Sequence, residues 1–146
     1  MTKKFNIRVY GILMNQNDEV LISDESRHDM KFTKFPGGGL EWGEGIVDCL
    51  KREFKEELSV NISVNELFYC TDFFIESAFN SSEQLISLYY NVQLLDENQL
   101  IIAKSLKIID NSKEEFESFR WIEIGEIDES TFTFPIDKIV GNKLKI

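Results

Sequence analysis

Three glutamates at helical spacing are the residues of this chain that are best placed to do chemistry. Glu53, Glu56 and Glu57 lie in segment 46–58, whose apolar residues recur at helical intervals. At 100° per residue the three carboxylates fall within about 100° of one another. Like charges three and four residues apart cost only a few tenths of a kcal/mol each. A solvated acidic face is therefore one interpretation, and a shared binding site is the other.

The loop before this segment favours the binding site. It spans residues 37–45 and is rich in glycine, which lets the backbone turn tightly and approach a ligand closely. Glu41 and Glu44 add two carboxylates just ahead of the helix. A glycine loop that brings several acids to one patch suits Mg²⁺, which takes oxygen ligands and keeps positions for water and substrate phosphate.

The same stretch carries a longer motif. It reads Gly38, five residues, Glu44, seven residues, and then Arg52-Glu53-Phe54-Lys55-Glu56-Glu57-Leu58-Ser59-Val60. This pattern resembles the Nudix box of the Nudix (MutT-like) hydrolases at every fixed position except one, where Ser59 replaces the family's glycine. The flanks look like the family pattern as well: Phe35-Pro36-Gly37-Gly38 on one side and Phe119-Arg120-Trp121 on the other.

The resemblance implies both a fold and a reaction. The implied fold is of the α/β (α+β) class, a Nudix-like α/β/α sandwich with a mixed sheet and a loop–helix–loop active site, in a single domain over residues 1–146. The implied reaction is Mg²⁺- or Mn²⁺-dependent hydrolysis of a nucleoside diphosphate linked to another group X, by attack of water on phosphorus. Metal ions would neutralise the phosphates and acidify the attacking water.

The resemblance also assigns roles to residues. Glu53, Glu56 and Glu57 would ligate the metal together with the backbone carbonyl of Gly38. Glu53 could also abstract a proton, although family members differ in which residue is the base. The expected catalytic set is these three glutamates and Arg52.

The remaining box residues would support this set. Arg52 would orient Glu53 through a charge-assisted hydrogen bond. Glu44 and Gly39 are the supporting residues of the box, and Glu41 is a weaker candidate because the box leaves its position free. Ser59 is expected either to end the helix in a left-handed conformation, at a cost of the order of 1 kcal/mol, or to be bypassed by an exit toward Asn61.

Several residues outside the motif allow two interpretations each. His28 is either a solvated loop residue or a substrate contact, and Trp42 either stacks on a base or a partner or packs beneath its loop. A distal acid could assist as a base or an extra ligand, and the candidates by position are Glu97, Glu114 and Glu115. The aromatic residues of the middle of the chain could belong to the core or line a base pocket: Phe73, Phe74, Phe79, Tyr89 and Tyr90.

Substrate markers known in family subgroups are absent after the box. No proline lies between Pro36 and Pro135, and no tyrosine stands about 17 residues past the box. These absences favour a nucleoside triphosphate or a nucleotide sugar without excluding ADP-ribose. The alternative function is a catalytically inactive Nudix-fold nucleotide sensor or interaction module. The intact acids of the box argue against it, because a retired site need not keep them.

Several elements are needed to position these residues. Strands are predicted over 7–14 and 20–23, joined as a hairpin by a turn at 15–18, and over 66–76, 86–94 and 119–124. Residues 26–31 read as a polar loop. A short helix should begin at Pro135 and run to about Val140, with Gly141 ending it. On the helix of segment 46–58, the stripe expected to face the core is Val47, Leu50, Phe54 and Leu58.

Composition and charge limit the classes of protein to which the chain can belong. The chain has 146 residues with 26 acidic and 16 basic side chains, a net charge of −10, which argues against a general nucleic-acid binder. Cys49 and Cys70 read as reduced core thiols rather than a disulfide framework. The longest charge-free run, 84–95, is too short to span a bilayer, and no signal peptide is evident. We therefore expect a cytoplasmic enzyme with a small nucleotide substrate, no nucleic-acid or membrane partner, and a possible homodimer.

Overall fold

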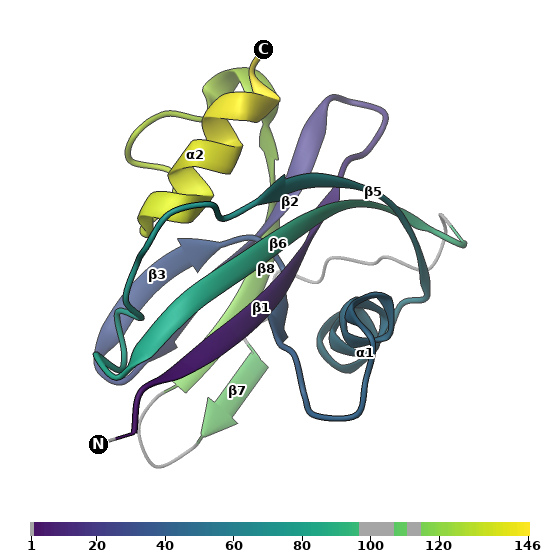
Figure 1. The fold of residues 1–146 in the computed structure, drawn as a ribbon. Helices are drawn as coiled ribbons and strands as arrows, with labels where there is room; N and C mark the ends of the chain where they lie inside the picture. Colours follow the sequence, from purple (N-terminus) through teal and green to yellow (C-terminus); the bar gives the residue numbers. More distant parts are fainter. Residues whose placement is uncertain (1, 97–106, 111–114) are drawn as a thin grey trace. The chain divides into compact units, whose positions relative to one another are not determined.

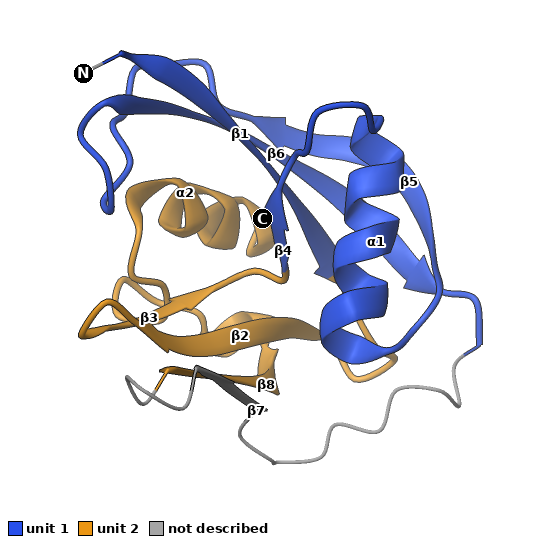
Figure 2. Ribbon diagram, turned by 90° about the horizontal axis from the view of Figure 1, so that it is seen from below, with its two compact units in different colours: residues 1–12, 37–99 blue, residues 13–36, 100–146 orange. Residues whose placement is uncertain are grey.

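The computed structural model describes residues 2–96, 107–110 and 115–146 (Figure 1). The chain forms two compact units, which Figure 2 distinguishes by colour. Unit 1 comprises residues 1–12 and 37–99, and unit 2 comprises residues 13–36 and 100–146. Within the described residues, each unit contains one four-stranded sheet and one α-helix. The predicted α+β class is confirmed.

The sheet of unit 1 has the order β4-β1-β6-β5. Its strands are β1 (Lys4–Leu13), β4 (Gly37–Gly39), β5 (Ile62–Cys70) and β6 (Glu83–Leu94). The β1–β4 and β5–β6 pairs are antiparallel. The central strands β1 and β6 instead run in the same direction (Figure 1), since Lys4 N donates to Ser82 O where both begin, and Gly11 lies against Val92 near their other ends. This sheet is mixed, as predicted.

Helix α1 (Ile46–Leu58) has the predicted limits and contacts β4 and β5. Its buried apolar residues are Cys49, Leu50 and Phe54, whereas Val47 of the predicted stripe is 41% exposed. On a helical wheel Glu53 and Glu57 fall between Cys49 and Phe54. The helix is therefore rotated so that two of its glutamates, rather than Val47, turn toward the sheet.

The sheet of unit 2 is antiparallel throughout and has the order β3-β2-β8-β7. Its strands are β2 (Glu19–Arg27), β3 (Met30–Lys34), β7 (Lys107–Asp110) and β8 (Glu115–Glu123). After β8 the chain forms a short 3₁₀ helix, η1 (Ile124–Glu126), and then α2 (Pro135–Leu144). In the described part of the chain, no helix has the length and apolar character needed to cross a membrane.

The hairpin predicted over 7–23 is confirmed only at its turn, and the polar loop predicted at 26–31 is wrong. The turn at 15–18 exists, because Asn15 Oδ1 accepts hydrogen bonds from the backbone of Asn17 and Glu19. A single bridge, Met14 to Val20, joins the flanking strands, which then pair in different sheets. The polar loop predicted at 26–31 is instead a tight hairpin between β2 and β3. His28 and Asp29 form its turn with positive φ angles of 52° and 61°, values that match the twist of a hairpin.

Two element limits also differ from prediction. The strand predicted over 66–76 begins earlier and ends at Cys70, because the following residues meet β6 through an isolated bridge between Glu76 and Gln84 and through scattered backbone hydrogen bonds rather than a continuous ladder. Helix α2 continues past Gly141 to Leu144. A Cβ at Gly141 would stand 2.8 Å from the Phe132 ring. This glycine therefore permits close packing against Phe132 and does not end the helix.

Candidate active site

Helix α1 begins and ends at residues whose backbone conformation caps the helix. Gly45 is the N-cap without a side-chain hydrogen bond, and Asp48 in the first turn interacts favourably with the helix dipole. Ser59 is the C-cap with φ 57° and ψ 34°, and its N–H donates to Lys55 O over 3.1 Å. The left-handed conformation predicted at the position of the family glycine is confirmed, and the alternative exit toward Asn61 is wrong.

Glu53 lies directly against the glycine strand β4. A Cβ built on Gly38 would stand 2.5 Å from the Glu53 carboxyl carbon and one of its oxygens, so only glycine leaves room for this approach. The Glu53 side chain is 13% exposed. Segment 37–39 and α1 thus bring a backbone strand and a carboxylate into contact.

Arg52 is the centre of the polar network on this side of α1. Its Nε and Nη2 donate to the two oxygens of Glu44 over 2.9 and 2.7 Å, a bidentate pair. Its Nη1 donates to Glu53 Oε1 over 3.1 Å and to Glu56 Oε2 over 3.2 Å. Its Nη2 also donates to Gly39 O over 3.2 Å. One guanidinium therefore fixes three carboxylates and the glycine strand relative to one another.

This network shifts the pKa values of its members. Hydrogen bonds from Arg52, and then one from the backbone of Glu41, lower the pKa of Glu44 to about 2. The same pairing with Glu44 raises the pKa of Arg52 above its ordinary value, although burial opposes the rise. Burial, and next the hydrogen-bonded neighbour Glu44, raise the pKa of the Cys49 thiol to about 12. At neutral pH Glu44 is therefore anionic, and Cys49 is an unreactive thiol.

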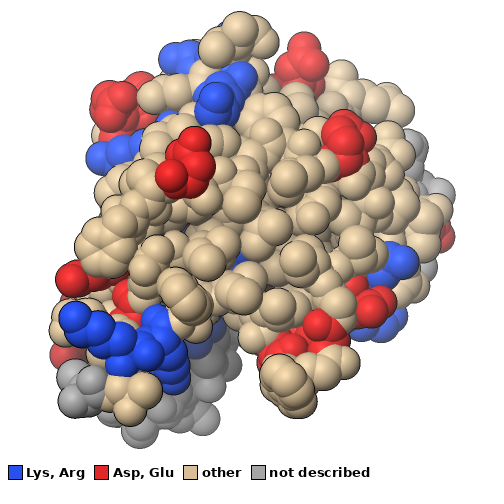
Figure 3. Space-filling model, in the orientation of Figure 1, with Lys and Arg blue, Asp and Glu red and all other residues tan. Residues whose placement is uncertain are grey.

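The other two box glutamates differ in exposure. The Glu56 side chain is 59% exposed beyond Arg52. Glu57 is half-buried, and its Oε2 atom is buried from solvent. Glu41 is 69% exposed and reaches Arg52 only at 3.8 Å. In Figure 3 acidic side chains gather where Figure 1 draws α1 and the loop before it.

The donor set on α1 fits a hard divalent cation in its chemistry. Glu53, Glu56, Glu57 and the Gly38 carbonyl offer only oxygen atoms, and one carboxylate oxygen of Glu57 is already withdrawn from water. In the structure the guanidinium of Arg52 holds the Glu53 and Glu56 carboxylates. Among the described residues, no group of three or more His, Cys, Asp or Glu side chains is arranged to hold a metal ion.

The residues with two interpretations are now placed. His28 is exposed on the β2–β3 turn, and Trp42 is fully exposed, so packing of Trp42 beneath its loop is wrong. Tyr89 is buried, but Phe73, Phe74 and Phe79 are exposed, so the core interpretation is wrong for these three. Glu115 begins β8 in unit 2, whereas the other two acid candidates, Glu97 and Glu114, lie outside the described residues.

Sequence reasoning missed Arg8, which stands in the register opposite Gly39 on β1. Its Nε donates to Tyr10 Oη over 3.1 Å, and Tyr10 packs against Tyr89 with ring centroids 5.0 Å apart. A cation inside an otherwise apolar strand was the available signal. Cys49 and Cys70 are both free thiols, as predicted.

Comparisons with known proteins identify the family of the chain. The NUDIX domain model matches residues 4–140. An RNA pyrophosphohydrolase of Legionella pneumophila (strain Corby) is 26% identical over 140 residues, which cover 89% of this chain and 76% of that protein. The 8-oxo-dGDP phosphatase of Mus musculus is 40% identical over 50 residues, which cover 34% of this chain and 16% of that protein.

A solved structure agrees with this assignment at the level of the fold. A NUDIX hydrolase from Nitrosomonas europaea is 19% identical with a TM-score of 0.69, covering 95% of this chain and 86% of that one. Since the family model spans most of the sequence and crosses both units, the chain belongs to the NUDIX family and is a Nudix hydrolase.

Proposed function

We propose that the chain hydrolyses a nucleoside diphosphate linked to a group X in the presence of Mg²⁺ or Mn²⁺. The observation that carries the proposal is the Arg52 network, in which one guanidinium holds Glu44, Glu53 and Glu56 beside the glycine strand. A solvated acidic face would not require glycine at position 38, whereas the close approach of the Glu53 carboxylate to Gly38 does.

Glu53, Glu56, Glu57 and the Gly38 carbonyl would hold the cation. When bound, such a cation neutralises phosphate charge and lowers the pKa of a coordinated water. The cation is also needed for binding, because a chain with net charge −10 repels an anionic substrate.

The chain's own residues supply positioning and proton transfer. Glu44 stays anionic at neutral pH and keeps Arg52 in place, and Arg52 in turn orients Glu53. Glu53 is the residue we propose as the base, because it is little exposed, hydrogen-bonded and in contact with the glycine strand. Arg52, Glu56 and Glu57 complete the proposed catalytic set.

The proposed substrate is a nucleoside triphosphate or a nucleotide sugar, with ADP-ribose as a further member of the same class. The acidic charge of the chain speaks against a long nucleic acid. The name of the Legionella relative nevertheless makes the 5′-triphosphate end of an RNA the alternative to test. We also propose that residues 1–146 form one Nudix domain, because a single family match crosses both units.

A release assay tests this proposal. Purified protein is incubated with Mg²⁺ or Mn²⁺ and with nucleoside triphosphates, nucleotide sugars, ADP-ribose, dinucleoside polyphosphates or a short 5′-triphosphate RNA. Release of nucleoside monophosphate or phosphate that EDTA abolishes is the expected result. Nucleotide binding without release from any compound would instead identify a sensor.

A further inference from the structure

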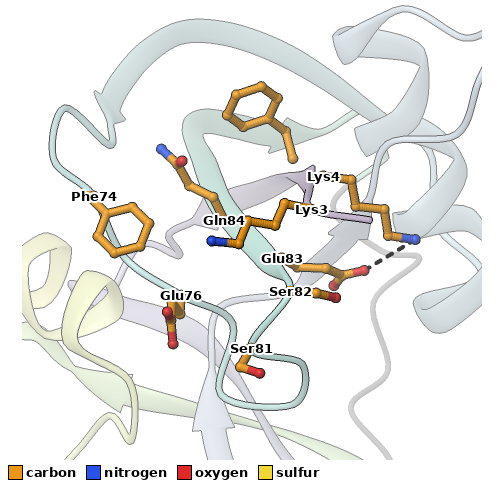
Figure 4. Close-up of a pocket in the computed structure, with 9 residues that line it drawn as sticks. Lys3, Lys4, Phe74, Glu76, Ser81, Ser82, Glu83 and Gln84 are labelled. Carbon is orange, nitrogen blue, oxygen red and sulfur yellow. Dashed lines mark ion pairs between the residues drawn. The ribbon is translucent and has the colours of Figure 1, made fainter. Parts of the chain in front are cut away.

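A pocket of about 210 Å³ opens at the start of β1 and β6 in unit 1 (Figure 4). Its walls come from three segments: the beginning of β1, residues 74–76, and the turn that leads into β6. None of its residues belongs to the Nudix box. The pocket is smaller than the sites that hold whole drug-sized ligands, so its volume suits a single ring system.

Two phenylalanines give this pocket aromatic walls. Phe5 is 65% exposed and Phe74 is 68% exposed, although phenylalanine is usually buried. Such rings, grouped on one surface, mark a binding site more often than chance exposure. Figure 4 shows the Phe74 ring directed toward the side chains of Gln84 and Lys3. A flat ligand could stack on these aromatic faces.

The polar groups of the pocket are largely balanced in charge. Lys4 Nζ pairs with Glu83 Oε2 at 3.4 Å, and Asn6 Nδ2 donates to Glu83 Oε1 over 3.2 Å. Figure 4 shows Lys4 extended toward Glu83 while Lys3 extends the other way, toward Phe74. The amide of Gln84 can both donate and accept hydrogen bonds. Aromatic faces with a donor–acceptor amide at the edge are what recognises a nucleobase.

The pocket shares a face of the sheet with the α1 carboxylates. Side chains alternate along a strand, so Phe5, Val9 and Gly11 point to the same side of β1. Gly11 faces Phe54 of α1, since a Cβ there would stand 2.6 Å from that ring. Val9 is the register partner of Gly38, against which Glu53 lies.

The distance between the two sites suits a nucleotide. Val9 follows Phe5 by four positions along β1, which places their backbones about 14 Å apart at roughly 3.4 Å per residue. The loop before α1 is attached to β1 between them, because Leu40 N donates to Ile7 O over 2.9 Å. A nucleotide whose phosphates lie at Glu53 can therefore extend along β1 with its base at Phe5.

We propose that the pocket of Phe5, Phe74 and Gln84 binds the nucleobase of the substrate. The proposal rests on the proposed function for the position of the phosphates, and it adds that this enzyme reads the nucleoside half of its substrate on the α1 face of β1. It follows that the pocket determines affinity and base preference, whereas the α1 carboxylates determine the rate.

Calorimetric titration without metal tests the pocket independently of turnover. The ligands are the uncharged nucleosides adenosine, guanosine, cytidine and uridine, with ribose as the ligand that lacks a base, so that no cation is needed to offset phosphate charge. The wild type should bind at least one of the four more tightly than ribose. Phe74→Ala and Phe5→Ala should each weaken that binding about tenfold, the effect of losing one stacking partner. Phe79→Ala, an exposed ring outside the pocket, should bind like the wild type.

Kinetics separate failure of the pocket from failure of the function. Phe74→Ala should raise KM about tenfold for the nucleotide substrate with little change in kcat, and should leave hydrolysis of inorganic tripolyphosphate unaltered. Equal binding of the nucleosides by the wild type, Phe74→Ala and Phe5→Ala, or no binding by the wild type, overturns the pocket whatever the activity. Base-dependent binding without hydrolysis of any anhydride would overturn the proposed function and leave the pocket standing.

Discussion

Each unit contains a cluster of carboxylates paired with cations, around Arg52 in unit 1 and around Lys34 in unit 2, and the two clusters differ in exposure. In unit 1, Arg52 holds Glu44, Glu53 and Glu56, and its own side chain is 24% exposed. In unit 2, Lys34 pairs with Glu25 at 2.9 Å, and these side chains are only 7% and 2% exposed. The first cluster can be reached by solvent and by a ligand, whereas the second is closed to both.

The unit 2 cluster is satisfied from within the protein. Ser23 Oγ donates to Glu25 Oε2 over 2.9 Å, and Arg27 pairs with Glu25 Oε1 at 3.1 Å. Lys34 also donates to Phe35 O over 3.2 Å. Burial alone would raise the pKa of Glu25, but the charges and hydrogen bonds of Lys34, Ser23 and Arg27 hold it below its ordinary value. Every partner needed to keep this carboxylate ionised is already present.

The two clusters differ in whether their carboxylates have oxygen atoms left to bind a ligand. Arg52 is shared among three carboxylates that offer more oxygen atoms than one guanidinium can occupy. Glu25 faces Glu117 across the β2–β8 pair, yet both are buried, an arrangement that needs nearby cations to offset the repulsion. We therefore expect substitutions in the Arg52 cluster to change activity and substitutions in the Lys34 cluster to change stability.

The largest expected effect is on turnover. Glu53→Gln and Glu57→Gln should each lower kcat by a factor of about 100 to 1,000, because each removes a charge from the proposed cation site and Glu53 is the proposed base. Urea unfolding should remain close to wild type for both. Asp48→Asn, an exposed carboxylate on α1, is the matched control and should keep kcat. Full activity of both glutamine variants would refute the role of α1.

Lys34→Met should act on stability instead. Removing the buried ammonium leaves Glu25 with its salt bridge to Arg27 and without its partner Lys34. Breaking a buried pair costs about 3 kcal/mol of stability. The measurement is the free energy of unfolding in urea. Lys31→Met, at an exposed position of the same strand, should change it by less than about 0.5 kcal/mol. Equal stability of the two variants would mean that the buried pair is not what distinguishes the clusters.

The pH dependence of stability should report on Glu44. Its pKa is about 2 in the folded chain against an ordinary value of 4.5. Since the folded pKa is the lower one, the stabilisation is fully present above about pH 4.5 and is lost as the pH falls toward 2. Unfolding curves at pH 5, 4 and 3 should show wild type and Glu44→Gln converging on acidification. Curves that stay parallel would contradict the Arg52–Glu44 pairing.

The smallest expected effect concerns the end of α1. Ser59 adopts a left-handed conformation that glycine occupies without strain. Ser59→Gly should therefore raise the free energy of unfolding by about 1 kcal/mol, or Tm by roughly 2 to 4 °C. Ser59→Ala should give no such gain, because alanine has the same Cβ penalty. A destabilised Ser59→Gly would show that the serine side chain contributes something that its backbone angles do not reveal.

Periodicity predicted the limits of α1, and the resemblance to the Nudix box predicted the left-handed angle at Ser59 and the hydrogen bond from Arg52 to Glu53. All three depend on residues that are close in sequence. The rotation of α1 could not be predicted in this way, because Val47 is as apolar as the other residues of the predicted stripe. Only packing against β4 and β5 decides which residues of the helix turn inward.

The remaining wrong predictions concern contacts between residues that are far apart in the sequence. The partners of β1 and β2 lie in different sheets, which a turn between two strands cannot indicate. The exposure of Phe74 depends on where residues 74–76 stand beside the start of β6. Aromatic composition alone favours the core for such a residue. The signals for a binding pocket therefore appeared only once the strands were placed.

Cation binding tests the central claim most directly. Titration of the wild type with Mn²⁺, followed by the loss of the free-ion signal in electron paramagnetic resonance, should show binding that Mg²⁺ competes away. The variant with both Glu53→Gln and Glu57→Gln should bind markedly less, and Asp48→Asn should bind like the wild type. Equal Mn²⁺ binding by the wild type and the double variant would place the cation elsewhere and contradict the account of α1.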